Sequence, residues 1–271
     1  MPQTISSNEQ LTAPVAPALS LFEYIVAKLI GADQIPPKTV KECNDELKQY
    51  SMTRYMKTLY FLCLTSCTII LDNKNKRDQT QTNESTQSLY NLSLFNVFND
   101  ITTYPNGPVA DGVYRALRDE NNTTPGMLFK AGRVLSLNDR KSQQDVSNSI
   151  DTIQNAYPYE AKLVKESLER LFGGEYTPLW DRKETGLSGI KYKDIDTQML
   201  IDVSHSFPSW IVATQDIEEE LYAQKGVKPV FDFIDNKGIR GNISALLQDE
   251  DYLRAELKTF ERFRRNRQEV R

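Results

Sequence analysis

The chain has 271 residues, of which 39% are hydrophobic and 26% are charged, and its formal net charge is −4. This balance is typical of a globular protein that can bury a sizeable core, and a net acidic chain gives no reason to expect a nucleic-acid binder as a whole. The three cysteines, Cys43, Cys63 and Cys67, lack the paired spacing of a zinc site. We interpret them as buried thiols of a protein in a reducing compartment.

Residues 1–19 are rich in Ser, Thr, Pro and Gln, with neither a basic start nor a continuous apolar stretch. They do not resemble a secretory signal, and we interpret them as a flexible segment. The longest apolar run, residues 59–71, is interrupted by Thr65, Ser66 and Thr68. It falls short of the roughly 20 residues that a membrane helix needs. We therefore expect a cytoplasmic protein with no membrane partner.

Two capping patterns open the first predicted helices. Ser20 and Glu23 have the spacing of a capping box, in which each side chain binds a free amide at the helix start. An apolar stripe follows them up to Gly31, a residue typical of a helix end. Thr39 and Glu42 repeat the capping pattern and predict a second, shorter helix.

A central helix and a polar loop come next. Residues 53–71 are apolar almost all round, which predicts a helix at the centre of the fold. Residues 72–89 contain no aromatic side chain and predict a long exposed loop. Further along, Pro108 is expected at the first position of a helix, where its missing N–H costs nothing. The inward face of that helix is predicted to be formed by Val109, Val113, Ala116 and Leu117.

Three more periodic helices are predicted in the second half of the chain. The polar residues 120–150 are expected to be irregular with some short helix, whereas residues 159–172, 195–204 and 252–267 have helical spacing. The last of these helices is basic, because seven Lys or Arg stand against four Asp or Glu from residue 251 onward. Its inward face is predicted to carry Leu253, Leu257 and Phe260.

These elements predict a mainly α fold, a compact single domain of helical-bundle type with little or no sheet. We expect the helical domain to span residues 20–215, and residues 216–271 to form a helical extension.

Three short blocks stand out in this order along the chain. They are Met56-Lys57-Thr58-Leu59-Tyr60-Phe61, then Asn106-Gly107-Pro108-Val109 with Tyr114, then Ser204-His205 with Pro208 and Trp210. Together they resemble the Panacea, or SocA-like, antitoxin domain, over residues of about 50–215. One departure is that Ser209 separates Pro208 from Trp210, which are adjacent in the usual pattern.

The resemblance implies an all-helical antitoxin of a bacterial or phage toxin–antitoxin pair, which neutralises a separate toxin protein by direct binding. One branch of the family acts instead as an adaptor that delivers its toxin to a cytosolic protease, so such a protease is a second partner that the resemblance implies. Residues 1–50 and 216–271 depart from the minimal family pattern. The residues expected at the partner interface are Asn106, Gly107, Pro108, Val109, Tyr114, His205, Pro208 and Trp210.

No catalytic constellation accompanies these blocks. His205 is the only histidine, and neither Cys63 nor Cys67 has the sequence context of a nucleophile. Acidic residues do not cluster with metal-ligand spacing, and no phosphate-binding glycine loop is present. We therefore expect no enzyme activity, no metal and no cofactor.

Each block also has a structural interpretation. His205 is placed to bind the last carbonyls of its helix, Pro208 to stop that helix, and Trp210 to pack back with its indole N–H paired. Tyr60 and Tyr114 are expected in the core, each with its hydroxyl bonded to a backbone group. A further alternative is a mobile-element protein that binds nucleic acid through the basic last helix, although we do not expect nucleic acid as the main partner.

Overall fold

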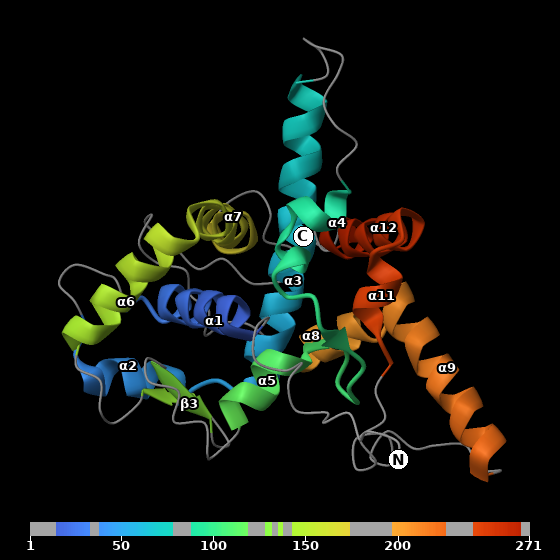
Figure 1. Cartoon of the computed structure of the whole chain (residues 1–271), viewed down its shortest axis with the longest axis horizontal. Helices are drawn as coiled ribbons and strands as arrows, with labels where there is room; N and C mark the ends of the chain where they lie inside the picture. The colour runs from blue at the N-terminus through green and yellow to red at the C-terminus, as the bar shows by residue number, and fades with distance from the viewer. Residues whose placement is uncertain are drawn as a thin grey trace, which may run out of the picture.

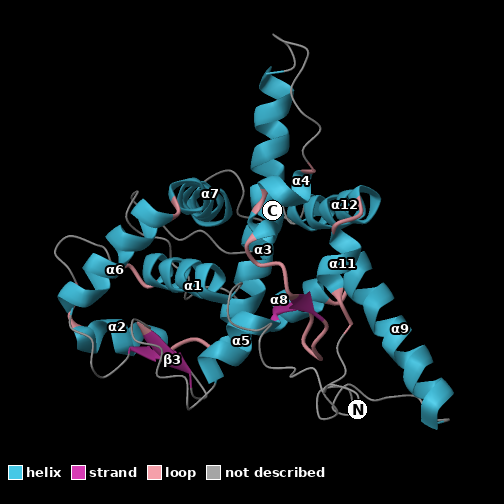
Figure 2. Cartoon of the chain, in the orientation of Figure 1, coloured by secondary structure: helices cyan, strands magenta, loops and turns pink. Residues whose placement is uncertain are grey.

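The computed structural model describes residues 15–32, 38–77, 88–118, 128–131, 135–137, 143–173, 197–225 and 241–266. Helices dominate this part of the chain (Figure 2), and its strands form two small antiparallel sheets of two strands each. The predicted mainly α fold with little sheet is therefore confirmed.

The helices and strands have the following bounds. The first helices are α1 (Val15–Leu29), α2 (Val40–Leu47), α3 (Met52–Arg77), α4 (Leu89–Leu92), α5 (Asp111–Arg118), α6 (Gln143–Ala156) and α7 (Pro158–Leu168). They are followed by α8 (Thr197–Ser204), α9 (Pro208–Lys225), α11 (Ile243–Leu247) and α12 (Glu250–Asn266). A 3₁₀ turn, η1, covers Leu94–Asn96, and a π-helical segment, η2 (Glu169–Gly173), continues α7. Strand β1 (Ile101–Thr102) pairs with β2 (Val109–Ala110), and β3 (Phe129–Ala131) pairs with β4 (Leu135–Leu137).

Helix α3 is the central element. Every residue from 54 to 70 is buried, which confirms the predicted helix that is apolar almost all round. Helices α1 and α7 pack against α3, as do α8 and α12. In Figure 1, α1, α6 and α7 lie on one side of α3, and α8, α9, α11 and α12 lie on the other. A side chain on any face of α3 therefore meets another element.

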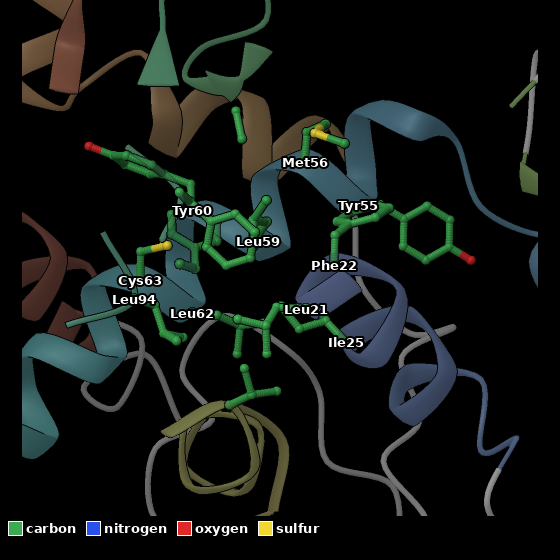
Figure 3. Packing of buried hydrophobic residues seen from close by; sticks show 14 of the residues in the cluster. Leu21, Phe22, Ile25, Tyr55, Met56, Leu59, Tyr60, Leu62, Cys63 and Leu94 are labelled. Carbon is green, nitrogen blue, oxygen red and sulfur yellow. The ribbon is translucent and has the colours of Figure 1, made fainter. Parts of the chain in front are cut away.

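Apolar side chains pack between α1 and α3. Figure 3 shows Leu21 and Ile25 of α1 beside Leu62 of α3, with Phe22 below Tyr55. Leu21, Phe22 and Leu62 are fully buried. Burying such side chains contributes roughly 1.5–3 kcal/mol each, so this contact is a main source of stability.

Helix α12 joins the same core from the other side. The ring of Phe260 stacks on Phe61 of α3, with centroids 5.8 Å apart and planes 17° from parallel. Leu253 and Leu257 are buried as well, as the spacing predicts. The last periodic segment is therefore packed on the central helix.

Two predicted helix starts have different outcomes. The capping box of Thr39 and Glu42 is confirmed, with both reciprocal hydrogen bonds present. The one predicted for Ser20 and Glu23 is wrong, because α1 begins at Val15 and both residues lie inside it. The Glu23 carboxylate instead accepts the backbone N–H of Leu128 at 2.7 Å. It therefore links α1 to the start of β3 rather than capping its own helix.

Two predicted irregular segments contain regular structure. Helix α3 runs on to Arg77, so the loop predicted for residues 72–89 is wrong over its first part, and residues 78–87 lie outside the described residues. Residues 120–150, for which some short helix was predicted, include the start of α6 and also the strands β3 and β4, which were not predicted. An already formed helix extends through polar residues at little cost, because each added residue also gains a hydrogen bond.

Candidate functional site

The three sequence blocks meet at one place, between α3, the segment from Tyr104 to Tyr114, and the corner where α8 passes into α9. The ammonium of Lys57 on α3 donates a hydrogen bond to the carbonyl of Pro108. His205 Nε2 donates to the Pro105 carbonyl at 2.8 Å. Trp210 Nε1 donates to the Tyr104 carbonyl at 3.1 Å. The first block thus binds the backbone of the second, and the third block binds the carbonyls of the two residues just before it.

A tight turn presents the carbonyls of Tyr104 and Pro105, and Pro108 follows it directly. The N–H of Gly107 donates to the Tyr104 carbonyl at 2.9 Å, which places Pro105 and Asn106 at the two central positions of a β-turn. Gly107 has a φ of +102°, a conformation that side chains strongly disfavour. A Cβ there would stand 2.5 Å from the Ser204 Cβ. Only glycine fits between the turn and α8.

The predicted helix start at Pro108 is wrong. Pro108 is buried and precedes β2, where Val109 pairs with Thr102 of β1. Helix α5 begins later, at Asp111. Asp100 caps it, because its carbonyl accepts the Asp111 N–H and its side chain accepts the Gly112 N–H. Strand pairing thus replaces the first helical turn predicted from the sequence.

At the corner between α8 and α9, the His205 ring stacks on the Trp210 ring, with centroids 4.5 Å apart. The bond from His205 Nε2 reaches Pro105 in the turn, whereas we predicted a bond to the end of its own helix. Pro208 occupies the first position of α9, so the prediction that it stops the preceding helix is wrong; α8 has already ended at Ser204. The predicted pairing of the Trp210 indole N–H is confirmed.

An aromatic cluster continues from the turn along α5. The rings of Tyr104 and Tyr114 meet edge to face, with centroids 5.3 Å apart. The Tyr104 hydroxyl donates to Asp111 at 2.5 Å, and Arg118 donates to the Tyr114 hydroxyl at the same distance. The Tyr114 hydroxyl therefore bonds a side chain, not the backbone group we predicted, and the ring is only partly buried.

Lys57 is fully buried, and burial holds the pKa of its ammonium well below the usual value. Its one hydrogen-bond partner among the described residues is the Pro108 carbonyl. Sequence reasoning quoted Lys57 within the first block but gave it no role. The signal was available, since a lysine within an otherwise apolar stretch must find a buried acceptor.

One turn along α3, Tyr60 belongs to a second buried polar group. Its hydroxyl donates to Glu256 Oε1 on α12, and not to a backbone group as predicted. Ser209 at the start of α9 donates its hydroxyl to Oε1 at 2.7 Å and its N–H to Oε2 at 3.1 Å. Burial nevertheless raises the pKa of the Glu256 carboxyl to about 7. Burial and the neighbouring Glu256 likewise raise the pKa of the Tyr60 phenol well above its usual value.

Sequence reasoning missed Glu256 altogether. Its position, between Leu253 and Phe260 on the inward face of α12, is the signal that would have found it. A carboxylate on an apolar helical face predicts a buried partner, which the structure supplies from two other helices.

The predicted interface residues divide into two groups. Asn106 is exposed, and Tyr114, His205 and Pro208 are partly exposed. The other four, Gly107, Pro108, Val109 and Trp210, are buried. The structure thus places the first group at the surface and uses the second to hold the segments together.

The described residues offer few reactive groups. All three cysteines are buried free thiols, as predicted, and burial raises the pKa of Cys67 to about 12. Within the described ranges, no set of three or more His, Cys, Asp or Glu side chains is arranged to hold a metal ion. No helix among those described has the length and apolar character to cross a membrane.

Comparison with protein-family models, with curated proteins and with solved structures finds no match to this chain.

Proposed function

We propose that this chain is an antitoxin of the Panacea kind, which neutralises a separate toxin by binding it directly. The supporting observation is that three blocks far apart in the sequence converge on one turn through direct hydrogen bonds. A common role at one site explains why the three blocks occur in the same sequence. Core segments with unrelated roles would not need to meet in the fold.

The surface proposed for the toxin consists of Asn106, Tyr114, His205 and Pro208, and we call it the turn surface. It is rigid, because His205 is stacked on a buried tryptophan and Tyr114 is held between Tyr104 and Arg118. A surface ordered before binding loses little entropy on association. Partly exposed aromatic rings supply much of the energy at protein interfaces.

The buried half of the motif has a separate task. Lys57, Gly107 and Trp210 fix the turn against α3 and the α8–α9 corner. Substituting them changes the position of the turn surface and the stability of the fold together. Toxin binding is therefore best tested at Asn106, which is exposed and lies at the tip of the turn.

The test is co-expression with the product of each adjacent reading frame. We expect one such product to stop growth when expressed alone, and growth to return with this chain and not with its Asn106→Arg variant. The matched control is Gln49→Arg, since Gln49 is exposed beyond α2, a helix that packs on β4. The control is expected to restore growth fully.

Purification of the two products together separates the outcomes. A stable complex that contains the inactive toxin is the expected result. A fall in the toxin level without a complex would indicate delivery to a cytosolic protease. If no adjacent product is toxic, the proposed antitoxin function is wrong. If Asn106→Arg protects as well as the unmodified chain, the proposed binding surface is wrong.

A further inference from the structure

Helix α12 has two faces of opposite character. Its inward face is buried and consists of Leu253, Glu256, Leu257 and Phe260. Its outward face carries Arg254, Lys258 and Arg262, which are all exposed. These three residues follow one another at intervals of four, so they form a row with about 6 Å of helix axis between neighbours. We call this row the basic stripe.

Within the part of the chain that the structure describes, two of the three charges on the stripe are not paired. Arg254 pairs with Glu250 at 2.9 Å. Lys258 and Arg262 form no ion pair with any of the described residues. Beyond the stripe the sequence adds Arg264, Arg265 and Arg267. The exposed stripe of Arg254, Lys258 and Arg262 therefore lies on a chain whose residues before 251 are net acidic.

The stripe is held in a fixed position. Phe260 stacks on Phe61, and the Glu256 carboxyl binds Tyr60 and Ser209. These contacts come from α3 and from the start of α9, so α12 cannot rotate its basic face inward without breaking the core. In Figure 1, α12 lies at the edge of the molecule, away from α1, α2 and α6.

We propose that the basic stripe binds the phosphate backbone of nucleic acid. This inference is independent of the proposed toxin neutralisation, which uses the turn surface. Positive side chains that contact phosphates release condensed counterions, which supplies affinity without reading the base sequence. Two of the three residues of the stripe are arginine, whose planar guanidinium binds phosphate through two parallel hydrogen bonds.

The apolar face of α12 argues against an anionic membrane as the partner. A helix that lies in a membrane surface inserts its apolar face among the lipids. On α12 that face is already buried against α3, with Leu253 and Phe260 fully inaccessible. Helix α12 thus presents charged side chains but no apolar surface that could insert into lipid. Such a charged surface suits contact with the hydrated phosphate backbone of nucleic acid.

The experiment measures binding of the full chain to a labelled DNA duplex of arbitrary sequence by fluorescence anisotropy, at salt concentrations from about 50 to 200 mM. The test variant is Lys258→Glu/Arg262→Glu. The control is Lys41→Glu/Lys48→Glu, which makes the same charge change at exposed positions in and just after α2. Circular dichroism verifies that both variants are folded, and Lys258→Gln/Arg262→Gln replaces the test variant if the reversal unfolds it.

The expected result is salt-sensitive binding that the stripe variant weakens about tenfold or more at the lowest salt, with the logarithmic salt slope reduced by about 2. The control is expected to stay within about twofold. Absence of binding at low salt overturns the proposal, and so does equal weakening by the control, because net charge alone would then explain the effect. Poly-glutamate is the competing probe: binding as tight as that of DNA, with the same response to the stripe variant, would reassign the surface to an acidic protein.

Discussion

At Gly107, a single added carbon atom would disturb the contact between the turn and α8. Two features exclude any other residue there. The φ of Gly107 is +102°, and an added Cβ would lie only 2.5 Å from the Ser204 Cβ. Moving α8 away would remove the close contact with Ser204 but would leave the backbone conformation unfavourable. The close contact between the turn and α8 thus requires glycine at this position.

Gly107→Ala is expected to lower the free energy of unfolding by about 1–3 kcal/mol, the usual cost of a strained backbone position. Urea unfolding followed by circular dichroism measures it. The control is Asn106→Ala in the same turn, which is exposed and should change stability by less than about 0.5 kcal/mol. Equal effects of the two substitutions would show that the contact with Ser204 is not tight in solution.

Lys57 is expected to make the free energy of unfolding depend on pH above neutrality. Burial lowers the pKa of its ammonium well below 10.5, the value expected in the unfolded chain. Between the two values the unfolded state binds more protons, so the contribution of Lys57 to stability rises with pH. Buried groups with raised pKa values, such as Cys67 and Tyr60, act in the opposite direction above about pH 9.

A comparison of the wild type with Lys57→Met isolates the lysine, because the other groups are common to both proteins. The free energy of unfolding of the wild type is expected to rise relative to that of the variant as the pH goes from neutral towards about 10. Urea unfolding at a series of pH values gives this difference. Lys48→Met, at an exposed position, should show no such trend. A constant difference between the wild type and Lys57→Met would contradict a lowered pKa.

At the scale of elements, Glu256 joins three helices through one carboxyl. Its raised pKa of about 7, against 4.5 for an ordinary glutamate, means that the folded state binds more protons between these values. The contribution to stability is therefore fully present below pH 4.5 and is lost as the pH rises through 7. At about 1.36 kcal/mol for each pH unit, the loss amounts to about 3 kcal/mol.

Glu256→Gln is expected to remove this dependence, since the amide fills the same space and has no proton to lose. The difference in stability between the variant and the wild type should grow by about 3 kcal/mol in favour of the variant from about pH 4.5 to about pH 8. Thermal or urea unfolding at both pH values measures it, with Glu219→Gln on the exposed side of α9 as control. Parallel pH profiles of wild type and Glu256→Gln would rule out a carboxyl of raised pKa.

Helical periodicity predicted the long elements well because it reports burial. Helices α3, α7 and α12 all lie where an apolar face recurs at helical spacing. The short strands could not be predicted, since two or three residues are too few to show alternation. The extension of α3 past Leu71, to Arg77, was missed because its side chains are polar. Its Asp72 forms a 2.7 Å ion pair with Arg170, a contact with a residue far along the chain.

The candidate site shows the same limit. The order of the three blocks identified the segments that meet, but not which side chains remain exposed. The bonds that decide this, from Lys57, His205 and Trp210, end on backbone carbonyls in or just after a turn. Every residue has a carbonyl, so no pattern of residue types marks the acceptor. Gly107 carried the strongest local signal, yet its partner across the contact, Ser204, is visible only in the folded chain.

At the scale of the whole molecule, helices from both sides of α3 share one core. Phe22 of α1 and Phe260 of α12 are each fully buried, and both belong to the same continuous cluster of buried side chains. If these helices fold as one unit, loss of either ring destabilises the entire molecule. If α12 folded as an attachment, removing Phe260 would release that helix and leave the rest unchanged.

Phe22→Ala and Phe260→Ala are each expected to lower the free energy of unfolding by about 3–5 kcal/mol, the usual cost of deleting a buried aromatic ring. Circular dichroism reports all helices, while fluorescence in a Trp180→Phe background reports Trp210 alone, because the chain has two tryptophans. A single unit requires both probes to give the same urea midpoint in each variant. Separate midpoints in Phe22→Ala, with Trp210 unaffected, would show that α3 does not couple its two sides.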